Sequence, residues 1–349
     1  MKTAIFCYSL KGRETARRAA DVLKKEYDAD MECFCPERIA KDEGSKGFGP
    51  IPRPSGDFYG GHFRDKDLLV SVGSVGICVR HIAPYIRSKV TDPAVIVIDE
   101  LGQHVIPILS GHIGGANRMA LALSECLGAE AVITTATDIN GRFAVDEWAA
   151  KKSMAISSMK AAKDYAAMIL ERDLPLKSDF PVKGKLPAGT YFGKEGEEAP
   201  VGLCITYRTD EPFGETLRLI PACLNLGIGC RRGTPKETIE GSVNSILKES
   251  GIDRRAIASI SSIDLKKDEE GLLGFSESLG IKPVFYTADE LNSLEGEFTP
   301  SEFVKSIAGV DNVCERAALM GADEIILKKT ALDGVTVSVG LKNTEVCFE

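Results

Sequence analysis

The sequence predicts a multi-domain α/β protein, with mainly parallel sheets flanked by helices and an antiparallel hairpin in both the N-terminal and the C-terminal domain. A chain of 349 residues is too long for one ordinary core. Strand-like apolar runs alternate with helical patterns, which is typical of parallel sheets covered by helices. We therefore expect three domains, at residues 1–135, 136–222 and 223–349.

The chain opens with a strand, a helix and a second strand. Residues 4–8 and 31–34 are strand-like, and alanines recur at helical spacing over 13–26, after a loop at Gly12. Residues 44–61 contain six glycines and three prolines. This composition predicts a surface loop, with a lid over a site as the alternative.

A hairpin and a helix complete the N-terminal domain. The turn ELGQ follows the buried run AVIVID, so the residues after it are expected to return antiparallel. Gly128 is placed to cap the helix that precedes it. The expected elements are a strand at 67–72, a loop at 73–76, a helix at 77–88, strands at 94–99 and 104–109, a loop at 110–115, a helix at 116–127 and a strand at 129–135.

The C-terminal part again alternates strands with helices. Thr234-Pro235-Lys236-Glu237 has the pattern of a capping box, which predicts the start of a helix that ends before Gly251. The runs EIILKK and VTVSVGLK predict a closing hairpin that turns at Asp333-Gly334. The middle part is less regular, with a helical stretch at 145–171 and strands at 201–207 and 217–220.

Composition and charge exclude several classes of function. The formal net charge is −8, and no basic stripe with aromatics between the charges indicates a nucleic-acid partner. No apolar run approaches the roughly 20 residues of a membrane span, and the N-terminus lacks a signal-peptide pattern, so we expect a cytoplasmic protein without a membrane partner. Ten scattered cysteines are expected to be free thiols, and the single close pair, Cys33 and Cys35, predicts no metal site.

Three loops share one design, in which a strand leads through glycines into the N-terminus of a helix. Free N–H groups and the helix dipole attract anions there, although glycine also serves such turns for purely steric reasons. None of the loops has a nucleotide-binding fingerprint. The candidate substrate-binding residues in and beside them are Gly73, Gly76 and Arg80, then Ser110, Gly111, Gly114, Gly115 and Asn117, and finally Gly229.

His112 separates the second loop from the other two. A histidine surrounded by glycines cannot be packed by its neighbours, so its imidazole is expected to meet a ligand and to act as acid or base near neutral pH. An unused loop histidine is the alternative. In the C-terminal domain, Arg231 and Arg232 form a forked set of donors suited to carboxylates, with a simple surface pair as the alternative.

The expected hairpin decides which acids can reach His112. If 104–109 runs antiparallel, the loop after it lies at the sheet edge where the strand 94–99 begins, next to Asp92. Thr135 and Asp138 follow the next parallel strand and are expected at the same edge. We therefore expect Asp138 or Asp92, rather than Asp99, to orient His112.

Long segments of the chain resemble the cobalt-precorrin-5A hydrolase family of anaerobic cobalamin biosynthesis, CbiG. In the N-terminal part they are GICVRHIAP, TDPAVIVIDELGQHVIPILSGHIGGANRMA and AVITTATDINGRFAVDEWA. LGIGCRRGTPKETIE and VDNVCERAALMGA are similar to that family's C-terminal domain. The resemblance covers nearly the whole chain and is weakest at 136–222.

The resemblance implies hydrolysis of the δ-lactone ring of cobalt-precorrin-5A with release of acetaldehyde, which gives cobalt-precorrin-5B. The expected partners are an anionic cobalt-corrinoid substrate and neighbouring pathway enzymes, and no cofactor is expected because the substrate carries the cobalt. His112 is our candidate base, while Ser110 and the amides of Gly114 and Gly115 are the candidate oxyanion donors. The alternative is a non-catalytic corrinoid carrier that shields and hands on a pathway intermediate.

Overall fold

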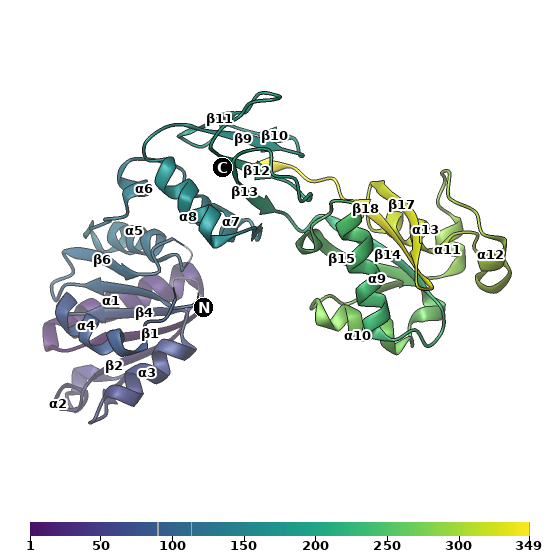
Figure 1. Ribbon diagram of the computed structural model, residues 1–349. Helices are drawn as coiled ribbons and strands as arrows, with labels where there is room; N and C mark the ends of the chain where they lie inside the picture. The colour runs from purple at the N-terminus through teal and green to yellow at the C-terminus, as the bar shows by residue number, and fades with distance from the viewer. Residues whose placement is uncertain (89–90, 113, 349) are drawn as a thin grey trace. The chain divides into compact units, whose positions relative to one another are not determined.

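The computed structural model describes residues 1–88, 91–112 and 114–348. The chain forms two units, Met1–Glu147 and Trp148–Glu349, which Figure 1 shows in purple to blue and in teal to yellow. Among the described residues, no helix is long and apolar enough to cross a bilayer.

A seven-stranded sheet forms the centre of the first unit (Figure 1). Its order is β3-β2-β1-β4-β5-β6-β7, and every neighbouring pair is parallel except β5 and β6. The predicted parallel sheet with one hairpin is confirmed. The strands are β1 (Lys2–Cys7), β2 (Asp30–Pro36), β3 (Phe48–Ile51), β4 (Leu68–Val72), β5 (Ala94–Ile98), β6 (His104–Leu109) and β7 (Glu130–Ala131).

Helices cover both faces of this sheet. Neighbouring strand residues point to opposite faces, so Ile5 packs with α1 and α5 while Phe6 packs with α3 and α4. The helices are α1 (Leu10–Tyr27), α2 (Glu37–Ala40), α3 (Gly56–Asp65), α4 (Val75–Ile82), α5 (Ala116–Leu127), α6 (Ala136–Ile139) and α7 (Val145–Lys151), with 3-10 turns η1 (Glu43–Ser45) and η2 (Ala83–Tyr85).

The expected loop at 44–61 is wrong, and so is its alternative as a lid. Residues 48–51 form β3, which pairs with β2, and α3 begins at Gly56. Gly60 allows α3 to approach η2, because a Cβ there would lie 2.7 Å from the ring of Tyr85. At position 60 the glycine therefore permits close packing rather than a flexible turn.

Three smaller expectations for the first unit also differ from the structure. Gly12 lies inside α1, because Ser9 caps the helix and accepts a hydrogen bond from the Gly12 amide at 3.0 Å. The helix expected over 77–88 ends at Ile82 and continues as η2. The last strand is only Glu130–Ala131. Gly128 caps α5 in the left-handed conformation, as predicted.

The second unit begins with a five-stranded sheet in the order β11-β9-β12-β13-β8, parallel except for β8. The single helix expected over 145–171 is wrong. Ser153 takes the left-handed conformation after α7, and Ser158 caps a new helix, α8. The elements are β8 (Ala155–Ile156), α8 (Met159–Met168), β9 (Leu174–Ser178), β11 (Thr190–Phe192), β12 (Val201–Ile205) and β13 (Glu215–Ile220).

A second sheet in this unit has the order β16-β15-β14-β18-β17. Strands β14, β15 and β16 are parallel, and β17 and β18 form the predicted hairpin. Asp333 and Gly334 both have positive φ, as a tight two-residue turn requires. The strands are β14 (Leu224–Cys230), β15 (Ile257–Ile263), β16 (Val284–Tyr286), β17 (Glu324–Leu332) and β18 (Val335–Leu341), and the short strands β10 (Val182–Lys183) and β19 (Val346–Cys347) pair with each other.

The predicted capping box at Thr234 is wrong. Pro235 is the N-cap of α9, and the Thr234 hydroxyl donates to the carbonyl of Arg231 at 2.7 Å instead of accepting from the helix. The helix ends before Gly251, as expected. The remaining helices are α9 (Lys236–Glu249), η3 (Arg254–Ala256), η4 (Asp264–Lys266), α10 (Glu270–Ser278), α11 (Ala288–Asn292), α12 (Glu302–Ala308) and α13 (Val313–Met320).

A buried ion cluster joins the two sheets of the second unit. Asp253 accepts hydrogen bonds from Arg218 of β13 at 2.8 Å and from Arg255 at 2.7 Å. Arg255 also donates to the carbonyls of Ile156 and Ser157, which belong to the first of the two sheets or follow it directly. The boundary expected at residue 222 thus falls within one unit, and the division into three domains stays a prediction.

Candidate functional site

The loop between β6 and α5 is held by its own backbone. The amide of Ala116 donates to the carbonyl of Ser110, that of Asn117 to Gly111 and that of Gly115 to His112. Ser110 takes a positive φ of 55°, which non-glycine residues rarely adopt. These bonds turn the chain sharply and place His112 at the tip of the loop. Ile113 of the loop lies outside the described residues.

Two glycines of this loop are needed for close approach. A Cβ at Gly114 would lie 2.5 Å from Cβ of Ser110 and 2.8 Å from its carbonyl oxygen. A Cβ at Gly111 would lie 2.7 Å from Oδ1 of Asn117. Larger residues at either position would displace the loop from the first turn of α5.

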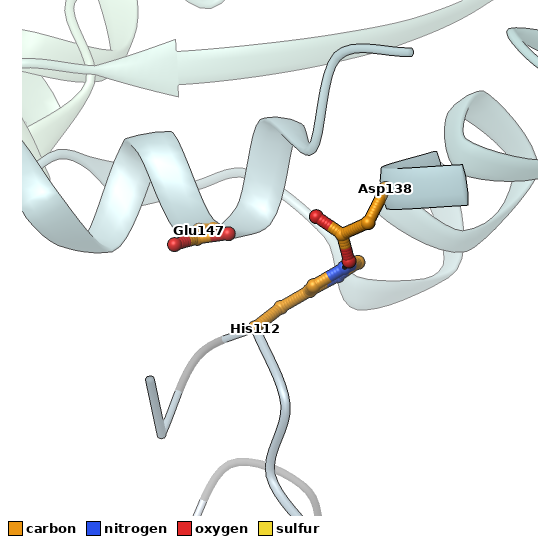
Figure 2. Close-up of side chains that lie close together, drawn as sticks. All are labelled: His112, Asp138 and Glu147. Carbon is orange, nitrogen blue, oxygen red and sulfur yellow. Dashed lines mark hydrogen bonds and ion pairs between the residues drawn. The ribbon is translucent and has the colours of Figure 1, made fainter. Parts of the chain in front are cut away.

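The imidazole of His112 lies between two carboxylates. Its Nε2 is 3.2 Å from Oδ2 of Asp138 and 3.1 Å from the hydroxyl oxygen of Thr137, both in α6. Its Nδ1 is 3.2 Å from Oδ1 of Asp146 in α7. Figure 2 shows the ring directed at Asp138, with Glu147 on the neighbouring helix. Both ring nitrogens are therefore engaged.

Asn117 fixes the position of Asp138. Its side-chain amide donates at 2.8 Å to Oδ2 of Asp138 and at 2.8 Å to the hydroxyl of Thr135. Asn117 is buried in the first turn of α5, so this helix, through Asn117, positions the carboxylate that faces His112.

The charges of the cluster shift two pKa values. The hydrogen bond to Asp146 raises the pKa of His112 to about 9, and Asp138 adds to this against the opposing effect of burial. Without a bound cation beside it, the imidazole is therefore protonated at neutral pH. Burial raises the pKa of Glu147, with the charge of Asp138 acting in the same direction and that of His112 in the opposite one.

Three side chains of the cluster are arranged as metal ligands could be. One donor atom each from His112, Asp138 and Glu147 lies within 4.8 Å of the other two. Within the described part of the chain, no hydrogen bond or ion pair engages the carboxylate of Glu147. The cluster thus combines an imidazole that is held in place with a half-buried carboxylate that accepts no hydrogen bond from the described residues.

Comparison with known proteins gives the family. Residues 57–138 match the family model described as cobalamin synthesis G N-terminal, and residues 224–340 match cobalamin synthesis G C-terminus. A cobalt-precorrin-5A hydrolase of Salmonella typhimurium is 32% identical over 97% of both chains. One from Priestia megaterium is 35% identical over 80% of this chain and 79% of its own. The chain belongs to the cobalamin synthesis G family.

In this family member the structure brings together part of the predicted site. Asp138 lies beside His112, and Thr135 and Asn117 lie behind it. Asp92 does not reach His112 in the described contacts, because its carboxylate accepts from the amides of Arg87 and Ser88.

Two of the three expected oxyanion donors are engaged within the protein. The Ser110 hydroxyl donates to the carbonyl of Asp92 at 2.9 Å, and the Gly115 amide donates to the carbonyl of His112. Ser110 therefore anchors the loop to the start of β5, and neither group is free to donate to a substrate in this arrangement.

The other predicted binding residues belong to other loops and strands. Gly73, Gly76 and Arg80 follow β4 at its carboxyl end, whereas His112 follows β6, which runs the opposite way, so they occupy opposite edges of one sheet. Gly229 lies in β14 of the second unit, and Arg231 and Arg232 follow that strand. Arg232 pairs with Asp268 at 3.2 Å and is exposed, as is Arg231.

Asp146, Glu147 and Thr137 were not predicted from the sequence. The available signal was the pair of adjacent acids in VDEW, inside a segment that already resembled the family. Their approach to His112 depends on the break between α6 and α7, which hydrophobic periodicity does not reveal.

Proposed function

We propose that this chain hydrolyses the lactone of cobalt-precorrin-5A, and that the reacting water is activated at the cluster around His112. The observation that carries the proposal is the setting of His112, whose ring is fixed between Asp138 and Asp146 at the tip of a glycine loop. His112 and Asp138 both lie within the residues that match the N-terminal family model. The relatives from Salmonella and Priestia are cobalt-precorrin-5A hydrolases, which supports this choice of substrate.

The proposed reaction consumes one water and releases one aldehyde. The water oxygen bonds to the lactone carbonyl carbon, the ring carbon–oxygen bond breaks, and the ring oxygen leaves as an alcohol with a proton from the water. The bond between the macrocycle and the alcohol-bearing carbon then breaks in a retro-aldol step. The alcohol carbon becomes acetaldehyde, and the macrocycle carbon keeps the electron pair and takes the alcohol proton.

This chemistry requires a group that activates water and a positive group for the developing oxyanion. Both nitrogens of the His112 ring face hydrogen-bonding partners, so a base role for His112 requires one of these contacts to open. The cluster as a whole, rather than the free imidazole expected from the sequence, is the catalytic centre of this proposal.

The test is an anaerobic incubation with cobalt-precorrin-5A in which released aldehyde is trapped as a hydrazone. We expect one acetaldehyde for each substrate molecule converted by the unaltered protein, and a loss of at least about 100-fold in rate for His112→Ala. His104→Ala is the matched control, because His104 also lies between two carboxylates but at the hairpin turn.

Substrate that binds and stays unchanged would contradict hydrolysis and would support the carrier alternative. Full activity of His112→Ala, with circular dichroism showing an intact fold, would exclude the His112 cluster as the catalytic centre.

A further inference from the structure

We propose that His112, Asp138 and Glu147 bind one divalent metal ion of the class that accepts both nitrogen and oxygen ligands, such as Mn²⁺. The three residues come from the loop before α5, from α6 and from α7, so three separate elements converge on one point. Figure 2 shows their side chains around a common space. The ion's chemical role below rests on the proposed function, but its binding does not.

The distances fit a shared ion. Ligand atoms on one ion are separated by at most twice the bond length, which is about 4.2 to 4.8 Å for bonds of about 2.1 to 2.4 Å. The three donor atoms all lie within 4.8 Å of one another, and Nε2 of His112 is 3.2 Å from Oδ2 of Asp138. Neighbouring ligands of a tetrahedral or octahedral ion are about 3.0 to 3.4 Å apart.

The surroundings of His112 have the arrangement that metal-binding histidines need. Such a histidine gives one nitrogen to the ion and donates its other N–H to a carboxylate, which fixes the ring. Nδ1 of His112 faces Asp146, which leaves Nε2 on the side of Asp138. Asn117 in turn holds Asp138 at 2.8 Å, so both residues that flank the expected ion are themselves positioned.

Glu147 is the second, independent indication. Its carboxylate is half-buried, has one oxygen within 4.8 Å of the donor atoms of Asp138 and His112, and has no hydrogen bond or ion pair within the described residues. A partly buried carboxylate beside another carboxylate is unfavourable unless a positive charge compensates it. The charges of His112 and Arg118 favour the ionised form of Glu147, but the ring nitrogens of His112 face Asp138 and Asp146, and burial still outweighs both charges and raises the pKa of Glu147.

His104 shows what an ordinary histidine–carboxylate contact looks like in the same unit. Its Nδ1 is 3.4 Å from Oδ2 of Asp99, and its Nε2 is 4.0 Å from Glu130. The Asp99 carboxylate, however, accepts from the amides of Leu101, Gln103 and His104. It therefore serves mainly to cap the hairpin turn, unlike the carboxylate of Glu147.

A bound ion would supply the water activation and the positive charge that the hydrogen-bonded groups of the loop cannot provide. With three protein ligands it keeps a position open for water, lowers the pKa of that water and stabilises a developing oxyanion. The ion, rather than the His112 ring, would then activate the water, and the engaged donors Ser110 and Gly115 would not be needed for the oxyanion. This proposal replaces the expectation from the sequence that the protein holds no metal.

The experiment measures Mn²⁺ binding by the full chain after chelator treatment, by calorimetry and without substrate. Mn²⁺ is the probe because the ten cysteines would compete for a softer ion such as Zn²⁺. We expect one Mn²⁺ per chain, and binding weakened at least about tenfold by Glu147→Gln and more strongly by His112→Ala. His104→Ala should bind as the unaltered protein does. With only four histidines to assign, Mn²⁺ should also broaden the imidazole NMR signals of His112 first.

No 1:1 binding below about 1 mM, or equal binding by His112→Ala and the unaltered protein, would overturn the proposal. Glu147→Gln preserves the shape of the side chain, so a loss of binding in this variant cannot be assigned to unfolding. Hydrolysis by chelated, metal-free protein would also overturn the role of the ion while leaving the hydrolase proposal intact. Metal binding without any aldehyde release would contradict the hydrolase proposal while leaving the metal site intact.

Discussion

Asn117 connects the His112 cluster to the scaffold through two hydrogen bonds of one amide group. It bonds Asp138 on one side and Thr135 on the other, and its own backbone amide donates to Gly111. The residue therefore closes the loop and orients the carboxylate at the same time. Its effect on the site comes from positioning, since its side chain acts through Asp138.

Replacing Asn117 with alanine should cost stability as well as activity. The variant removes a buried side-chain amide that bonds the Asp138 carboxylate and the Thr135 hydroxyl, so we expect the free energy of unfolding of the first unit to fall by about 1–3 kcal/mol. Urea titration measures this. Asn140→Ala is the control, because Asn140 is exposed and its side chain donates to the carbonyl of Ala136 in its own short helix, and it should change stability by less than about 0.5 kcal/mol. Equal effects of the two variants would contradict this reading of Asn117.

Among the elements, α13 depends most clearly on a glycine. Gly227 of β14 lies directly under this helix, since a Cβ there would be 1.8 Å from the carbonyl oxygen of Cys314 and 2.5 Å from the amide nitrogen of Ala318. Gly227 lies two residues before Gly229, which the sequence assigned to a candidate anion-binding loop. In the structure it serves the packing of α13 on the sheet.

Gly227→Ala should therefore destabilise the second unit by about 3 kcal/mol, because the helix must move away from the strand. Gly241→Ala is the matched control in α9, where the added methyl group would meet nothing within 4 Å. We expect that variant to be more stable by about 0.5–1 kcal/mol, since glycine is a poor helix former. Thermal unfolding of both variants checks the pair. A neutral Gly227→Ala would show that α13 is not seated as described.

At the scale of the whole molecule, the ion cluster of Asp253 makes the stability of the second unit depend on pH. Burial alone would raise the pKa of Asp253, but the hydrogen bonds from Arg255 and Arg218 outweigh it and lower the pKa to about 2. A carboxyl with a lowered pKa stabilises the fold above its ordinary pKa of about 4, and this contribution is lost as the pH falls toward 2.

The comparison of Asp253→Asn with the unaltered protein isolates this effect. We expect the variant to be less stable at pH 6, and the difference in unfolding free energy to shrink by about 2 kcal/mol between pH 5 and pH 2. Asp268→Asn removes the exposed pair with Arg232 and should show almost no such change. A difference for Asp253→Asn that stays constant with pH would assign its cost to packing alone.

The sequence predicted elements whose signal is local. The buried run of β5, the hairpin into β6, the Gly128 cap and the Asp333-Gly334 turn all follow from patterns within a few residues. The strand reversal at β6 was enough to place Asp138, instead of Asp99, next to His112. The order of strands in a sheet therefore carries information about a site before any side chain is placed.

What the sequence did not predict depends on contacts between segments. The six glycines of 44–61 predict a loop, because the sequence does not reveal that the ring of Tyr85 lies against Gly60. Asp92 is near the loop of His112, as expected, but backbone amides occupy its carboxylate. Asp146 and Glu147 reach the site because α7 begins at Val145, after a break that the sequence does not reveal. Pro235, rather than Thr234, occupies the N-cap position of α9, so the expected capping box does not form.

The reversal of β6 has a consequence for how the first unit can handle a ligand. The glycine turn Gly73–Gly76 and the His112 loop lie beyond opposite ends of β4 and β5, whose five residues span about 17 Å. The sheet acts as a rigid spacer, so no single carboxylate of a ligand can touch both turns at once. The sequence of one turn can therefore change without disturbing the other turn. A ligand that contacts both turns must extend around the sheet.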